Sequence, residues 1–156
     1  MISQWSNLDL SSLMDAAERI RRSFAKQGLM TTLGATLGDI APGSVEISLI
    51  PNPAITQQHG FVHAGAVSAI ADTAAGYAAM SLVREGVGIL TTEFKINLVA
   101  PAAGDRIIAR ARVVKPGRTL TLVQANIFAE SKGHEKLIAL LTATMMAIEG
   151  RDGILD

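Results

Sequence analysis

One long apolar segment, residues 63–84, limits the folds open to this chain more than any other feature of its sequence. Its length approaches that of a membrane span, but Asp72 lies near its centre and other polar residues interrupt it. A carboxylate at the middle of a bilayer is costly, whereas a protein core tolerates one that has a hydrogen-bonding partner. We therefore predict a helix buried in a protein core, and no contact with a membrane.

The rest of the chain divides into one amphipathic helix and several strand-type segments. Residues 11–26 repeat apolar side chains at helical spacing, with charged residues on the other side, and Gly28 ends this predicted helix. Residues 44–50 alternate apolar and polar side chains with the period of a half-buried strand. The predicted strand-type segments are 29–39, 44–50, 89–98, 106–114, 119–130 and 137–148, and residues 51–61 are predicted to form a loop.

This order of elements predicts an α+β fold, in which an antiparallel sheet wraps around one long buried helix. Turn signals at hairpin spacing separate the last four strands, which favours antiparallel pairing. The length of 156 residues fits a single domain, 1–156, with an N-terminal helix at about 11–27 and a core at about 29–149. One helix covers only part of a sheet, so we expect two copies of the chain to form a dimer.

Composition excludes several functions. The chain has 14 basic and 14 acidic residues and no basic run, which argues against nucleic-acid binding. It has no cysteine, so a thiolate nucleophile, a disulfide and a cysteine-based metal site are excluded. The absence of cysteine fits the cytoplasm, and residues 1–5 lack the basic and apolar regions of a secretory signal, so we expect a cytoplasmic protein.

Asp72 is the polar residue that most needs an explanation. Small residues make up its face of the predicted helix, namely Gly65, Ser68, Ala69, Ala75, Gly76 and Ala79, whereas bulkier residues occupy the opposite face. In one interpretation, Asp72 lines a close helix contact and hydrogen-bonds the backbone or Ser68. In the other, it points into a narrow cleft that a substrate enters, where its pKa is shifted. Replacement by asparagine separates the two, since the first predicts loss of folding and the second loss of turnover.

His63 lies at the start of the same helix, nine residues before Asp72. At roughly 100° per residue the two side chains point to opposite sides, and a rise of about 1.5 Å per residue separates them by about 13 Å along the axis. They cannot meet in one site within one chain. If both serve one reaction, we predict that one subunit contributes His63 and the other contributes Asp72.

Other arrangements of these polar residues are less well supported. His59 and His63 have the spacing of a helical metal pair, but Gly60 indicates a loop, and the glutamate of the zinc-protease motif is absent. We therefore expect no metal. No serine lies in a nucleophile-elbow context, which argues against a Ser–His–Asp triad. A third interpretation, in which His63 caps the helix, is compatible with a catalytic role and stays open.

These residues resemble the signature of a known family. Residues 57–65, QQHGFVHAG, and the following Ala71-Asp72-Thr73-Ala74 are similar to the motif of the phenylacetate-pathway (PaaI-like) branch of hot-dog thioesterases. That motif has asparagine or glutamine, then glycine, then His-Gly-Gly, and an acidic residue nine positions after the histidine. Residues 91–97, 101–105 and 117–118 also resemble the family's strands and turns, so the resemblance covers about residues 43–149.

The resemblance implies a hot-dog fold and an acyl-CoA thioesterase without a cofactor, which hydrolyses an aryl or a short- or medium-chain acyl thioester to free acid and CoA. Asp72 would be the nucleophile or the general base, and the backbone N–H of Ala64 would polarise the carbonyl. Gln57 and His63 would orient that carbonyl, and Thr91 would be a partner for the attacking water. The expected substrate-binding residues are Gly65, Phe61, Gly76, Tyr77 and Arg118. Family members commonly pair dimers into tetramers.

The sequence departs from the family motif at Ala64, where the motif has glycine. Alanine still supplies the N–H group, but we expect its methyl group to crowd the acyl group. A carrier-protein thioester is an alternative substrate. Two other functions stay open. One is a hot-dog hydratase or dehydratase, whose local pattern is not found here. The other is a non-catalytic protein that binds acyl-CoA or an acyl carrier, which predicts binding that survives Asp72→Ala.

Overall fold

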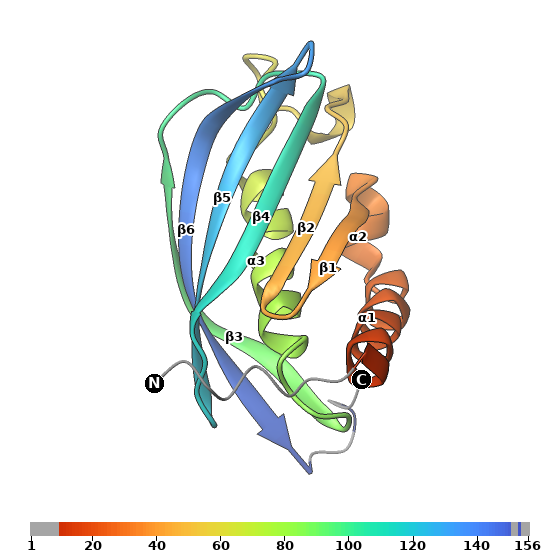
Figure 1. Ribbon diagram of the computed structural model, residues 1–156. Coiled ribbons are helices and arrows are strands. Elements are labelled where there is room, and N and C mark those ends of the chain that lie inside the picture. Colours follow the sequence, from red (N-terminus) through yellow and green to blue (C-terminus); the bar gives the residue numbers. More distant parts are fainter. Residues whose placement is uncertain (1–9, 151–152, 154–156) are drawn as a thin grey trace.

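A six-stranded antiparallel sheet curves around helix α3 (Ala64–Met80) in the computed structural model, which describes residues 10–150 and 153 (Figure 1). The strands follow the order β1-β2-β4-β5-β6-β3 across the sheet, so β1 and β3 form its two edges. The strands are β1 Thr36–Ala41, β2 Ser44–Leu49, β3 Val87–Leu98, β4 Arg106–Lys115, β5 Leu120–Ser131 and β6 His134–Glu149. This architecture confirms the predicted α+β class, with a sheet wrapped around one long helix.

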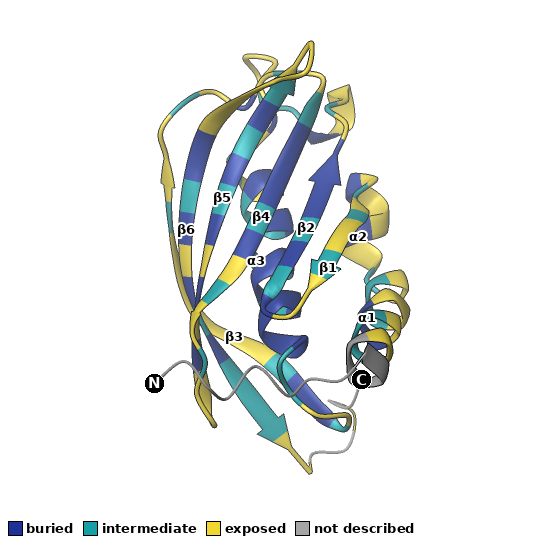
Figure 2. Cartoon of the chain, in the orientation of Figure 1, coloured by how far each residue is buried: buried dark blue, intermediate teal, exposed yellow. Residues whose placement is uncertain are grey.

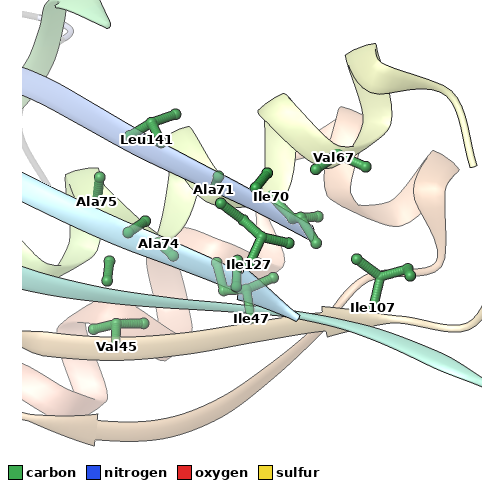
Figure 3. Packing of buried hydrophobic residues seen from close by; sticks show 14 of the residues in the cluster. Val45, Ile47, Val67, Ile70, Ala71, Ala74, Ala75, Ile107, Ile127 and Leu141 are labelled. Atoms are coloured by element: carbon green, nitrogen blue, oxygen red, sulfur yellow. The ribbon is translucent and has the colours of Figure 1, made fainter. Parts of the chain in front are cut away.

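The core lies between the sheet and α3. Side chains alternate along the central strands, so that one face of each strand is buried, as are Val123, Ala125 and Ile127 of β5. The helix presents small side chains such as Ala71 and Ala74 to these strands, which lets its backbone lie close to the sheet (Figure 3). Burial follows this interface, since buried residues are concentrated on α3 and alternate with less buried ones along the central strands (Figure 2).

The N-terminal region differs in part from its prediction. Helix α1 (Leu10–Ala25) forms as expected, but residues 29–33, predicted as the start of a strand, belong to a second helix, α2 (Gly28–Leu33). Met30 and Leu33 lie three positions apart, on one face of this helix, and both are buried. Gly34 ends α2 in the left-handed conformation, with φ +63°, which favours glycine. Gly28 therefore begins a second helix, and the first strand begins only at Thr36.

Helix α3 ends at Met80, earlier than its predicted end at residue 84. The Arg19 guanidinium group of α1 donates hydrogen bonds of 2.8 Å to the carbonyl oxygens of Met80 and Val83. The Ser81 hydroxyl accepts a hydrogen bond of 2.7 Å from the Gly43 N–H. The two Arg19 contacts pair carbonyl groups that the end of a helix leaves unsatisfied, so the chain can turn here. The Arg19 contacts also fix α1 against the end of α3.

Strand β3 carries a bulge and an open edge. Its register with β6 shifts between Thr91, opposite Met145, and Glu93, opposite Thr144, so Thr92 is an extra residue. Within the described ranges β3 pairs only with β6, which leaves its other edge unpaired. Exposed apolar residues lie on or next to this strand, namely Leu90, Phe94, Leu98 and Val99. An open strand edge with apolar neighbours is suited to pairing with another chain.

No helix among residues 10–150 is long and apolar enough to cross a membrane. Two expectations concern residues outside the described ranges. The absence of a secretory signal was expected from residues 1–5, and the predicted domain 1–156 has both its ends in residues that the structure does not describe.

Candidate active site

Asp72 and Thr91 form a hydrogen-bonded pair beside the open edge of the sheet. Asp72 belongs to α3, and the Thr91 hydroxyl group on β3 donates a hydrogen bond of 2.8 Å to its Oδ1. The same hydroxyl lies 3.4 Å from the sulfur of Met145. A hydroxyl has one hydrogen and a carboxylate is the stronger acceptor, so the bond to Asp72 prevails. In the described part of the chain, Oδ2 of Asp72 then has no hydrogen-bond partner.

The partner of Asp72 differs from those that helix spacing suggested. Ser68, one of the two suggested partners, donates its hydrogen bond to the Ala64 carbonyl instead, at 2.8 Å. The Asp72 carboxyl is half-buried, and this burial raises its pKa above the ordinary value of 3.8, while the Thr91 hydrogen bond lowers it. Burial is the larger effect, so the carboxylate is a stronger base than one in water.

A cavity of about 230 Å³ opens beside this carboxylate. Three of the predicted site residues, Gly76, Tyr77 and Thr91, line it. Ser23 and Gln27, at the C-terminal end of α1 and just beyond it, line it as well. Sequence reasoning missed both, because no local pattern connects them with α3. Only the packing of α1 against the end of α3 brings them to the cavity.

The remaining catalytic candidates gather at the start of α3. His63 is the N-cap residue, and its Nδ1 accepts a hydrogen bond of 2.8 Å from the Gly65 N–H, which confirms the capping interpretation. A side chain at Gly65 would crowd this cap, since a Cβ there would lie 3.1 Å from Nδ1. The Ala64 N–H has no hydrogen-bond partner among the described residues. It lies at the positive end of the helix dipole.

A second cavity, of about 560 Å³, adjoins this helix start and is lined by Gln57, Phe61, His63 and Ala64, among others. The Gln57 amide oxygen accepts a hydrogen bond from the His59 N–H, so the NH₂ group of Gln57 is left to donate to a ligand. A backbone N–H and an amide NH₂ beside one cavity are suited to a carbonyl oxygen on which negative charge develops.

The two groups of candidates line separate cavities within one chain. The cavity at the start of α3 and the cavity beside Asp72 share no lining residue. Leu98 of β3 lines the first cavity, whereas Ile89 and Thr91 of the same strand line the second. Opposite ends of β3 therefore border the two cavities, in agreement with the separation that helix spacing predicted for His63 and Asp72.

Arg118, predicted to bind substrate, is exposed in the turn between β4 and β5. Strand register places this turn toward the Asp72 end of the sheet, because Leu120 lies opposite Met146, which in turn lies opposite Leu90. Arg118 is thus remote from the start of α3 in the same chain. Across residues 10–150 and 153, no three His, Asp or Glu side chains form a group that could hold a metal ion.

Comparisons with known proteins agree on one family. Residues 59–135 match the family described as Thioesterase superfamily. The chain is similar to a thioesterase family protein from Silicibacter pomeroyi, with 51% sequence identity and a TM-score of 0.85 over 86% of this chain and 99% of that one. No curated protein matches the chain.

Two more distant structures share the fold. The PaaI protein from the phenylacetic acid degradation operon of E. coli is 22% identical, with a TM-score of 0.79 over 88% of this chain and 96% of that one. A thioesterase from Haemophilus influenzae is 21% identical, with a TM-score of 0.76 over 85% of this chain and 90% of that one. These likenesses confirm the hot-dog fold that the sequence motif implied.

Proposed function

The chain belongs to the thioesterase superfamily and is a thioester hydrolase, and we propose that it cleaves acyl-CoA with Asp72 as its catalytic carboxylate. The observation that carries this proposal is the Asp72–Thr91 pair at the mouth of a cavity. Asp72 is the only titratable side chain other than Tyr77 among the residues that line this cavity. Its raised pKa suits a group that accepts a proton or attacks a carbonyl.

In the proposed reaction, Oδ2 of Asp72 takes a proton from a water molecule while the water oxygen bonds to the carbonyl carbon. The carbonyl π electrons move to the carbonyl oxygen, where the Ala64 N–H and the Gln57 NH₂ group stabilise the negative charge. Collapse of this intermediate breaks the C–S bond, and the CoA thiolate takes the proton from Asp72. Thr91 holds Oδ1, and so aims Oδ2 at the water.

Direct attack by Oδ2 on the carbonyl carbon, with an anhydride as intermediate, is the alternative role for Asp72. A single turnover in ¹⁸O-labelled water tests for an anhydride that water opens at the Asp72 carboxyl carbon. The general-base route places the label only in the acid product, whereas label in the Asp72 side chain would identify the anhydride route.

We infer that two copies of the chain build each active site, by antiparallel pairing of their β3 edges. Such pairing about a two-fold axis brings the Leu98 end of one β3 to the Thr91 end of the other. The helix-start cavity of one subunit then meets the Asp72 cavity of its partner. The exposed apolar residues along β3 support this arrangement, because pairing would cover them. Further pairing of dimers into tetramers stays a prediction.

Mixing two inactive variants tests the shared site. A subunit with Asp72→Ala retains the Ala64 N–H, and a subunit with Ala64→Pro lacks that N–H but retains Asp72, so each mixed dimer regains one intact site. After unfolding and refolding together, random pairing restores about a quarter of the wild-type activity. Sites built within single chains would give no recovery, which would contradict the shared-site arrangement.

A panel of aryl, short-chain and medium-chain acyl-CoA esters tests the activity itself, with thiol release as the measurement. We expect Asp72→Asn to lower kcat by about 10²–10⁴-fold, the usual contribution of a catalytic base. The matched control is Asp39→Asn, which changes an exposed carboxylate on β1 and leaves kcat intact. No release of CoA from any ester by folded protein would refute the proposal. The same panel carried on an acyl carrier protein identifies the carrier.

A further inference from the structure

We propose that the cavity beside the catalytic carboxylate selects short acyl groups with a neutral hydroxyl at their far end, recognised by a cluster of Ser23, Gln27 and Tyr77. This inference rests on the proposed function, because it assumes that the reacting carbonyl lies next to Asp72. It goes further by naming a substrate class and by assigning recognition to the N-terminal helix.

The cluster is a chain of hydrogen bonds between two helices. The Gln27 Nε2 donates a hydrogen bond of 2.8 Å to the Tyr77 hydroxyl, which donates one of 3.2 Å to the Ser23 hydroxyl. All three residues line the cavity that contains Asp72. The Gln27 side-chain oxygen has no hydrogen-bond partner in the part of the chain that the structure describes, so an acceptor is left for a ligand.

An open path leads along α3 from the carboxylate to this cluster. Gly76 lies one helical turn beyond Asp72, about 6 Å along the axis, and Tyr77 follows it. A Cβ added at Gly76 would meet no atom within 4 Å, so the space above this glycine is free. The cavity volume of about 230 Å³ is smaller than the roughly 300–1,000 Å³ of typical ligand pockets, so it fits a short acyl group.

The polar far end of this path determines which acyl groups fit. An aliphatic tail placed there would exclude water from the Gln27 amide without replacing its hydrogen bond. A hydroxyl group can donate to the Gln27 oxygen, and so replaces the hydrogen bond that water would make there. A carboxylate fits poorly, because no Lys or Arg lines the cavity and Asp72 would repel a second negative charge. A neutral hydroxyl is therefore the group that this end satisfies.

The position of the cluster is fixed by contacts outside the cavity. Arg19 holds α1 against the end of α3 through two carbonyl groups. The ring of Phe24 packs on the ring of Tyr77, with centroids 6.3 Å apart. These contacts hold α1 so that Ser23 and Gln27 meet Tyr77, and a preorganised cluster discriminates more strongly than a mobile one.

Three acyl-CoA esters of similar length test the inference: 5-hydroxypentanoyl-CoA, hexanoyl-CoA with a methyl in place of the hydroxyl, and glutaryl-CoA with a carboxylate. We expect kcat/KM for the hydroxylated ester to exceed that for each of the others by about 10-fold or more. Tyr77→Phe and Gln27→Leu should each bring the hydroxy-to-methyl ratio toward one. The control Gln124→Leu, at an exposed position of β5, should leave the ratio unchanged.

Three outcomes would overturn the inference and leave the proposed function intact. The first is equal turnover of the hydroxylated and methyl esters, and the second is faster turnover of glutaryl-CoA. The third is a hydroxy-to-methyl ratio of kcat/KM that survives both substitutions. If no ester is hydrolysed, the proposed function fails, and calorimetric binding to the Asp72→Asn protein decides the inference. Tighter binding of the hydroxylated ester than of hexanoyl-CoA supports it, and equal dissociation constants overturn it.

Discussion

Replacement of Ala64 by proline would remove the helix-start donor without removing a hydrogen bond of the fold. Ala64 is the first residue of α3, and its N–H has no partner among the described residues. The preceding His63 has extended backbone angles, φ −61° and ψ 139°, which a residue before proline adopts readily. Proline is favoured at the first position of a helix, and Pro53 already occupies it in the short helix η1 (Pro53–Ile55).

The two expected effects differ greatly in size. Loss of one donor to a developing oxyanion lowers kcat by about 10²–10³-fold, which corresponds to about 2.7–4 kcal/mol of transition-state stabilisation. The free energy of unfolding should change by less than about 1 kcal/mol, since proline at a compatible position restricts the unfolded chain. Ala64→Gly is the matched control, because it keeps the N–H and should keep kcat.

Thiol release measures kcat and KM, and urea denaturation measures stability. The proline ring occupies the place of the amide hydrogen, so a purely steric effect has to be separated from loss of the donor. Crowding of the substrate raises KM, whereas loss of an interaction made only in the transition state lowers kcat. A stable Ala64→Pro protein with wild-type kcat would refute the assignment of this N–H.

Thr91→Val removes the hydrogen bond that lowers the pKa of Asp72, so the acidic limb of the kcat/KM profile should move to higher pH, as measured over a pH series. Burial raises the folded-state pKa of Asp72, so ionisation costs stability as the pH rises from the unfolded value of 3.8 through the folded value. Asp72→Asn should therefore raise Tm at neutral pH, and the gain should vanish below about pH 3.8. Arg19→Met should lower the free energy of unfolding in urea by about 1.5–3 kcal/mol, because two carbonyl groups lose a charged donor. Arg118→Ala should raise KM for acyl-CoA but not for the same acyl group on N-acetylcysteamine, which has no phosphates. Equal effects on the KM of both substrates would exclude an interaction between Arg118 and the CoA phosphates.

The features predicted from the sequence are those that a periodic pattern encodes. The buried helix was predictable because apolar residues surround Asp72 on most sides, and the strands because apolar residues alternate. The separation of His63 from Asp72 needed only the geometry of one helix. The motif around these residues was also sufficient to indicate the family.

Features that depend on packing between distant segments could not be predicted. Helix α2 was missed because Met30 and Leu33 lie in a run of residues suited equally to a strand. The burial of both side chains on one face of the segment favours the helix. The early end of α3 depends on Arg19, a residue of another helix. Ser23 and Gln27 line the cavity beside Asp72 through packing of a distant segment as well, since about 50 positions separate them from Tyr77.

The bulge at Thr92 has a consequence for how this strand can evolve. Thr91, before the bulge, and Phe94, after it, both lie opposite residues that face the helix, Met145 and Ala143. Three positions separate these two residues, so regular alternation would put them on opposite faces of the sheet, and the bulge at Thr92 returns them to one face. Deletion of Thr92 would leave Thr91 opposite Met145 and Glu93 opposite Thr144 in a regular ladder, so both halves of the strand would keep their faces. The strand can therefore gain or lose one residue at this point without exchanging the faces of its catalytic half or its apolar half.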